Sequence, residues 1–171
     1  YQAAPIFYSE TEPRDGVARV QERIRSGRLE FRGSDREILR QLLSELRVPE
    51  SSQVLLFTKT SLQRQLISPG NPRAIYFSDD CYVGWVPGGL MEVATVDPNL
   101  GPVFYAFDPH LNPGATNRFT RDADCLRCHG GTFVRGIPGI LARSVPTDAL
   151  GEPLLQFDFV MALCAAARHE G

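Results

Sequence analysis

Two cysteines and a histidine lie within five consecutive residues, Cys125-Leu126-Arg127-Cys128-His129. The spacing C-x-x-C-H is that of covalent haem attachment. On a helical turn the two thiols match the two vinyl groups of a porphyrin, and the imidazole that follows points at the iron as an axial ligand. Asp122 or Asp124 can begin that turn, because a carboxylate is favourable at a helix N-terminus. The motif predicts one covalent haem c, held by the two thiols and His129.

Other uses of the same cluster have less support. A structural zinc site needs four ligands, and the chain has no second C-x-x-C or H-x-x-x-H pair to complete one. A thioredoxin-type dithiol would follow a strand early in a βαβ pattern, whereas residues 108–124 are rich in Pro, Gly and Asn. A zinc-binding module therefore remains only as an alternative to haem.

The second axial ligand of the iron is left open by the sequence. Met161 lies downstream in an apolar run, as the methionine ligand does in small cytochromes, and His110 lies in the loop before the motif. His169 is close to the chain end, and Met91 begins a predicted strand, where methionine is usually core filler. A five-coordinate or water-bound iron is the remaining alternative, and it would favour gas binding or peroxide chemistry.

Charged and aromatic residues surround the motif. Four arginines are candidate partners for the two haem propionates, although at least half of them are expected to be solvated surface residues: Arg118, Arg121, Arg127 and Arg135. Several aromatic residues could wall a haem pocket, although an ordinary core is the favoured interpretation for any single one: Trp85, Phe104, Tyr105, Phe107, Phe119 and Phe133.

The pattern of apolar residues predicts an α+β fold. Residues 1–14 read as an arm anchored by Ile6, Phe7 and Tyr8, and residues 15–171 as a single haem-binding domain. Capping signals and apolar stripes predict helices at 15–27 and 34–46. Short apolar runs predict strands, with a hairpin around Gly88-Gly89 and a short helix at 60–67. The strand runs are 53–57, 74–77, 82–86, 91–96 and 103–107, and a last helix is possible at 157–167.

The place of the motif in the chain also constrains the fold. Small all-helical cytochromes c begin with a helix that carries the motif, whereas here 124 residues precede Cys125 and the segment just upstream reads as loop. The sequence therefore predicts N-terminal helices, a small antiparallel sheet and a haem-binding segment on the C-terminal side. It does not predict the ordinary all-helical cytochrome c fold.

Composition excludes several classes of protein. The chain has 171 residues, 43% of them hydrophobic, and a net charge of −2 with dispersed basic residues, which argues against nucleic-acid binding. No apolar run is long enough to cross a bilayer. The chain opens at Tyr1 with neither Met nor a basic-then-apolar leader, so it reads as a mature or a trimmed chain, and a removed secretory signal would explain this start. Cys81 and Cys164 are left over, and two buried thiols are favoured over a disulfide.

Two further segments carry a resemblance to a known group. The stretches SSQVLLFTKTSLQ, from Ser52, and PRAIYFSDDCYVGW, from Pro72, followed by the haem motif, are similar to a group of mostly uncharacterised exported bacterial proteins with one c-type haem motif. The resemblance covers roughly residues 50 to 155. It implies export and covalent haem, with Cys125 and Cys128 as thioether positions and His129 as axial ligand, but it implies no reaction.

The sequence as a whole predicts a soluble c-type cytochrome in the periplasm or otherwise exported. Its expected role is one-electron transfer, either as a free carrier or as a subunit of a larger redox complex, with redox proteins or a membrane redox complex as partners. The first alternative is a haem enzyme or gas-binding protein with an open distal site for peroxide, NO or CO. The second is the zinc-binding module.

Overall fold

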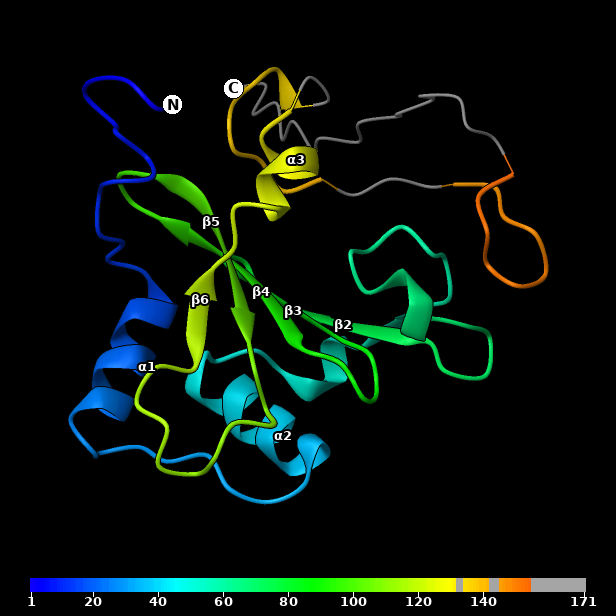
Figure 1. Ribbon diagram of the computed structural model, residues 1–171, viewed down its shortest axis with the longest axis horizontal. Coiled ribbons are helices and arrows are strands. Elements are labelled where there is room, and N and C mark those ends of the chain that lie inside the picture. Colours follow the sequence, from blue (N-terminus) through cyan, green and yellow to red (C-terminus); the bar gives the residue numbers. More distant parts are fainter. Residues whose placement is uncertain (132–133, 142–144, 155–171) are drawn as a thin grey trace, which may run out of the picture.

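Six antiparallel strands form one sheet in which the spatial order follows the chain, β1-β2-β3-β4-β5-β6 (Figure 1). The computed structural model describes residues 1–131, 134–141 and 145–154. Helices and antiparallel strands together confirm the predicted α+β class. The strands are β1 (Val54–Leu56), β2 (Arg73–Phe77), β3 (Cys81–Trp85), β4 (Met91–Asp97), β5 (Gly101–Phe107) and β6 (Phe119–Arg121).

The two faces of the sheet differ in burial. Successive side chains of a strand point to opposite faces, and along β4 the residues Met91, Val93 and Thr95 are buried whereas Glu92 and Ala94 are not. We call the side of the sheet that carries Met91, Val93 and Thr95 the helix-covered face, and the opposite side the open face. The open face includes Ile75, Phe77, Tyr82, Gly84, Glu92, Ala94, Val96, Phe104 and Ala106.

The two longer helices lie on the helix-covered face of the sheet (Figure 1). Helix α1 (Gly16–Arg25) begins because the Asp15 carboxylate accepts a hydrogen bond from the backbone N–H of Ala18, as the sequence predicts. Helix α2 (Asp35–Glu45) begins at Ser34, whose backbone N–H donates to the Glu37 carboxylate. Both helices therefore start where local capping signals place them.

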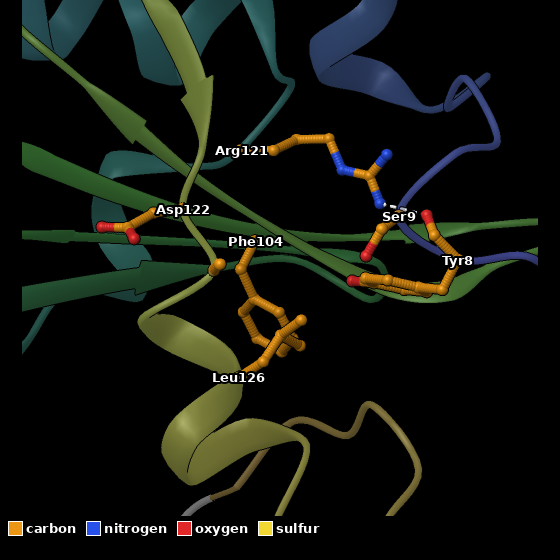
Figure 2. Close-up of a pocket in the computed structure, with 7 residues that line it drawn as sticks. Tyr8, Ser9, Phe104, Arg121, Asp122 and Leu126 are labelled. Carbon is orange, nitrogen blue, oxygen red and sulfur yellow. Dashed lines mark hydrogen bonds between the residues drawn. The ribbon is translucent and has the colours of Figure 1, made fainter. Parts of the chain in front are cut away.

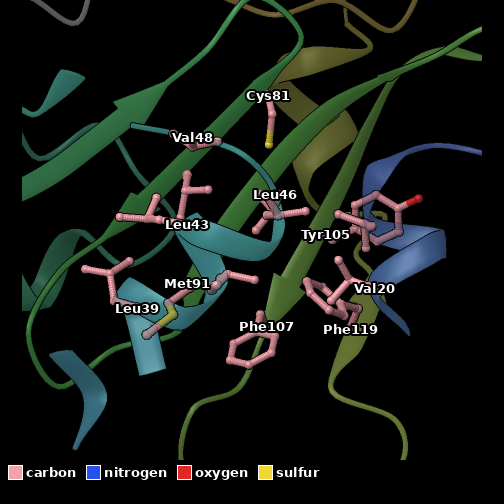
Figure 3. Close-up of a cluster of buried hydrophobic side chains, with 14 of the residues drawn as sticks. Val20, Leu39, Leu43, Leu46, Val48, Cys81, Met91, Tyr105, Phe107 and Phe119 are labelled. Atoms are coloured by element: carbon pink, nitrogen blue, oxygen red, sulfur yellow. The ribbon is translucent and has the colours of Figure 1, made fainter. Parts of the chain in front are cut away.

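The side chains between the helices and the sheet form the hydrophobic core (Figure 3). Phe107 on β5 is fully buried, with its ring centroid 5.1 Å from that of Phe31 and 4.9 Å from that of Phe119. Leu42 and Leu43 of α2 expose no more than 1% of their surface to solvent. Burial of this apolar surface is the main source of stability for the domain.

The N-terminal arm lies along the edge of the sheet beside β5 and β6 (Figure 2). Tyr8 is its main anchor, because its ring is buried and its hydroxyl donates to the carbonyl of Pro102 over 2.7 Å. The Arg121 guanidinium donates to the carbonyls of Tyr8 and Thr11 and lies 4.9 Å from the Tyr8 ring centroid. Phe7 corrects the prediction, since its side chain is 42% exposed and does not anchor the arm.

All five predicted strands are present, with shifts of one or two residues at their ends. The hairpin around Gly88-Gly89 is confirmed by the pairing of β3 with β4. The predicted helix at 60–67 is wrong, because only a short 3-10 turn, Arg64–Leu66, forms there. The interpretation of 108–124 as continuous loop is also wrong, because Phe119–Arg121 pairs with β5 as a sixth strand.

Some predictions fall on residues that the structure does not describe. They concern Phe133, Met161, Cys164, His169 and the helix at 157–167. Within the described ranges, no helix has the length and apolar character needed to cross a membrane.

Candidate functional site

The C-x-x-C-H motif forms a short helix, α3 (Cys125–His129), which follows β6. The Asp122 side chain begins the turn, because its carboxylate accepts a hydrogen bond from the backbone N–H of Asp124 at 2.9 Å. The backbone N–H of Gly130 closes the turn on the carbonyl of Leu126 at 2.8 Å. Residues three and four apart share a helix face, so Cys125, Cys128 and His129 project on one side. The helical turn predicted for the motif is confirmed.

The imidazole of His129 is held by two contacts from distant parts of the chain. Its ring centroid lies 4.5 Å from that of Phe104 on the open face, so α3 sits on the side of the sheet away from α1 and α2 (Figure 1). Its Nδ1 lies 3.0 Å from the carbonyl oxygen of Gly139. A carbonyl only accepts, so Nδ1 carries the proton and donates, and Nε2 is the ring nitrogen that would bind a metal.

The two motif thiols differ in exposure. Cys125 is half-buried and Cys128 is exposed. Burial, together with the nearby carboxylates of Asp122 and Glu92, raises the pKa of the Cys125 thiol to about 12. A redox-active dithiol requires a lowered pKa, so the surroundings of Cys125 give the thioredoxin-type interpretation no support.

The four predicted propionate partners are divided between engaged and exposed positions. Arg118 is buried, and its guanidinium donates to the carbonyls of Leu111 and Asn112. The Arg121 guanidinium donates to carbonyls of the N-terminal arm. Burial also lowers the pKa of the Arg118 guanidinium. Arg127 and Arg135 are exposed, with Arg127 3.9 Å from Asp124. Two of the four arginines, Arg127 and Arg135, thus have the exposure expected of surface residues.

The structure does not bring the described distal candidates to His129. The imidazole of His110 lies 3.2 Å from the Asp35 carboxylate at the start of α2, and that helix lies on the opposite side of the sheet from α3. Met91 is fully buried in the core on the helix-covered face. Met161 and His169 lie outside the described residues.

One of the candidate aromatic residues touches the motif. Phe104 is 6% exposed, and its ring and the Leu126 side chain lie together in Figure 2. The other described aromatics belong to the core on the helix-covered face, namely Trp85, Tyr105, Phe107 and Phe119. Phe104 can therefore support a group bound to His129, whereas these four fill the core as the favoured interpretation had it.

A cavity of about 190 Å³ lies beside the start of α3. It separates the arm from β5 and is lined by Tyr8, Ser9, Phe104, Arg121, Asp122, Ala123 and Leu126 (Figure 2). Pockets for drug-sized ligands are usually about 300 Å³ or more. This cavity is therefore too small to enclose a porphyrin.

Sequence reasoning missed the residues that approach the motif from a distance. The Gly139 carbonyl is ten residues after His129 and carries no side-chain signal. Glu92 acts electrostatically on Cys125 although it is 33 residues earlier in the sequence. Glu92 alternates with buried residues in β4, which is the pattern of a residue on the open face. No local signal connects that face to the motif.

In the residues that the structure covers, no group of three or more His, Cys, Asp or Glu side chains is arranged to hold a metal ion. The zinc-binding alternative therefore has no support from the described part of the chain. No family model, no curated protein and no solved structure matches this chain. What the site does must be inferred from its own chemistry.

Proposed function

We propose that this chain is an exported c-type cytochrome that carries one haem, attached through Cys125 and Cys128 and ligated by His129. Its function is one-electron transfer, alone or within a larger redox complex. When bound, the haem supplies an iron that alternates between the ferrous and ferric states. The chain supplies the thioether positions, an axial ligand and the surroundings that set the reduction potential.

The contact between His129 Nδ1 and the Gly139 carbonyl is the observation that carries this proposal. A metal-binding histidine usually donates its second N–H to a carbonyl or a carboxylate, which fixes its tautomer and orientation and raises its basicity. The 3.0 Å contact does this for His129. The Phe104 ring lies against the imidazole and restricts its rotation.

The helical turn of the motif is the second support. Cys125 and Cys128 are three residues apart on α3 and both are free thiols. The thiol chemistry fits thioether formation, in which each S–H adds across a vinyl C=C, with sulfur bonding to one carbon and hydrogen to the other. No oxidant is consumed and no group leaves. Two thiols and one imidazole on a single turn thus match the donor set of covalent haem c.

The test is maturation of the chain in a bacterial host that exports it and attaches haem. We expect one haem per chain that stays bound on a denaturing gel, with a Soret band and sharp reduced α and β bands. The double substitution Cys125→Ser, Cys128→Ser should abolish covalent haem. Cys81→Ala is the matched control, because Cys81 is a free thiol buried in the core away from α3.

The spectrum also separates the alternatives. A low-spin spectrum supports electron transfer, whereas a high-spin ferric spectrum with rapid CO binding would indicate a gas-binding or peroxide-reactive haem. Absence of a Soret band from the wild-type chain, in a host that attaches haem to a known cytochrome, would contradict the proposal.

A further inference from the structure

The open face of the sheet carries a surface that no described element fully covers. It extends from Phe104 beneath His129 toward β2, and its side chains are mostly apolar. Phe77 is 42% exposed and Val96 43% exposed, although both are large apolar residues on strands. The surface is continuous with the motif, because Phe104 and Ala106 belong to the same strand and point to the same face.

A charged pair lies in this apolar surface. The Arg73 guanidinium on β2 bonds the Glu92 carboxylate on β4, and both side chains are less than a quarter exposed. Ser61 donates to the other oxygen of the same carboxylate at 3.0 Å. Gly84 on β3 lies between the two strands, and a Cβ there would be 2.6 Å from Arg73 Nη2. The absence of a side chain at Gly84 therefore lets Arg73 lie flat across the sheet.

The pair is close to the haem motif. Glu92 is opposite Ala106 in the β4–β5 register, and Phe104 is the next residue of β5 on the same face. Diagonal neighbours of this kind are about 7–8 Å apart. The Glu92 carboxylate also acts on the Cys125 thiol. A vinyl carbon bonded to Cys125 sulfur would thus lie near Glu92 and near the Arg73 guanidinium that bonds the same carboxylate.

The Arg73 guanidinium also has unused hydrogen-bonding capacity. Its Nε is buried without a hydrogen-bond partner in the described structure, and its Nη2 is used by Glu92. Buried donors are nearly always paired, so a missing acceptor is informative. Guanidinium groups recognise planar carboxylates. The arginines that are closer to the motif in sequence differ from Arg73. Arg118 and Arg121 already donate to backbone carbonyls, and Arg127 is exposed.

Resting on the proposed function, we propose that Arg73, oriented by Glu92 across Gly84, binds a propionate carboxylate of the haem attached to Cys125 and Cys128. The porphyrin then lies over the open face between α3 and β2, and its apolar edge covers side chains that are otherwise exposed. Arg73 neutralises the propionate, and Glu92 places a carboxylate near the thioether edge. The pair therefore sets the reduction potential through two opposite charges.

The test compares reduction midpoint potentials of holoprotein variants in spectroelectrochemical titrations. Removing a positive charge near the iron favours the ferric state, so Arg73→Gln should lower the potential. Removing the carboxylate in Glu92→Gln should raise it, and the double variant should lie between the two. Arg127→Gln is the charge-matched control. Its side chain is 75% exposed, and water screens exposed charges, so its shift should be much smaller.

The covalent haem content of each variant is measured first. Wild-type chain without haem would contradict the proposed function, whereas full haem content with equal shifts for Arg73→Gln and Arg127→Gln would overturn only the role of Arg73. Shifts of the same sign for Arg73→Gln and Glu92→Gln would also overturn it, because a general loss of packing would move both potentials together. If Arg73→Gln does not fold, Arg73→Lys keeps the charge, and its potential should stay closer to that of the wild type than that of Glu92→Gln.

Discussion

The two faces of the sheet differ in how completely their side chains are buried. On the helix-covered face, α1 and α2 close over side chains such as Phe107 and Met91, which are fully buried. On the open face, α3 covers Phe104, but Phe77 and Val96 are more than two-fifths exposed. The helix-covered face is mostly apolar, although the carboxylates of Asp15 and Asp97 are also buried there, whereas the open face combines apolar side chains with the Arg73–Glu92 pair.

This difference separates stability from function within one sheet. A core residue is stabilised by its burial, so its contribution is present whether or not a ligand is bound. Exposed apolar residues contribute little until something covers them. Substitutions on the helix-covered face should therefore change the stability of the chain without haem. Substitutions on the open face should act mainly on the chain with haem.

The largest expected effect comes from the core. Phe107→Ala should lower the free energy of unfolding of the haem-free chain by about 3–5 kcal/mol, because it removes a fully buried ring that packs on Phe31 and Phe119. Phe77→Ala is the matched substitution on the open face and should cost less than about 1 kcal/mol. Denaturant titration followed by circular dichroism measures both. Similar losses for the two variants would show that the open face is already buried without haem.

The next effect concerns the edge at which the arm closes the sheet beside α3. Arg121→Gln removes the donors to the carbonyls of Tyr8 and Thr11 and the contact with the Tyr8 ring. Hydrogen bonds from charged groups are worth about 1.5–3 kcal/mol each, and we expect a total loss of about 3 kcal/mol. Hydrogen exchange in residues 1–14 should increase before the sheet unfolds. Exposed Arg135→Gln is the control and should change neither quantity.

An arm that stays protected in Arg121→Gln would show that the Tyr8 ring and its hydrogen bond to Pro102 are sufficient to hold it. Arg121 would then be available to bind a haem carboxylate, and it would have to be counted with the residues that act on the chain with haem.

Sequence patterns predicted the helix-covered face better than the open face, and the reason is physical. The starts of α1 and α2 depend on Asp15 and on the Ser34–Glu37 pair, which are local signals. Strand β6 was missed because three residues are too few to show the alternation of apolar and polar side chains that identifies a strand. It forms through pairing with β5 and through the Gln21 side chain, which accepts from the N–H of Phe119. That side chain is 98 residues away, so only the folded chain reveals the contact.

The site divides in the same way. The helical turn of α3 and its start at Asp122 follow from neighbouring residues. The Phe104 ring, the Gly139 carbonyl and the Glu92 carboxylate reach the motif through tertiary structure. Arg118 and Arg121 are close to the motif in sequence, but the fold directs their guanidinium groups to loop and arm carbonyls. Proximity in sequence was therefore a poor guide to where these guanidinium groups point.

The smallest effect concerns the carboxylate that ties the arm to the helix-covered face. Asp97 is 2% exposed and accepts from the backbone N–H groups of Arg14, Asn99 and Leu100. Burial opposes its ionisation, but these hydrogen bonds outweigh burial and hold the pKa of Asp97 below its usual value. Its contribution to stability is therefore complete above the ordinary carboxyl pKa of about 3.9 and is lost as the pH falls through the lower, folded-state pKa.

Asp97→Asn should thus cost about 1–2 kcal/mol at pH 7, because the amide oxygen keeps part of the hydrogen bonding without the charge. Below about pH 4 the gap between variant and wild type should narrow, since the wild-type carboxyl also becomes neutral. Unfolding titrations at a series of pH values measure this gap. A gap that is constant from pH 7 to pH 3 would mean that hydrogen-bond geometry, and not charge, holds the arm.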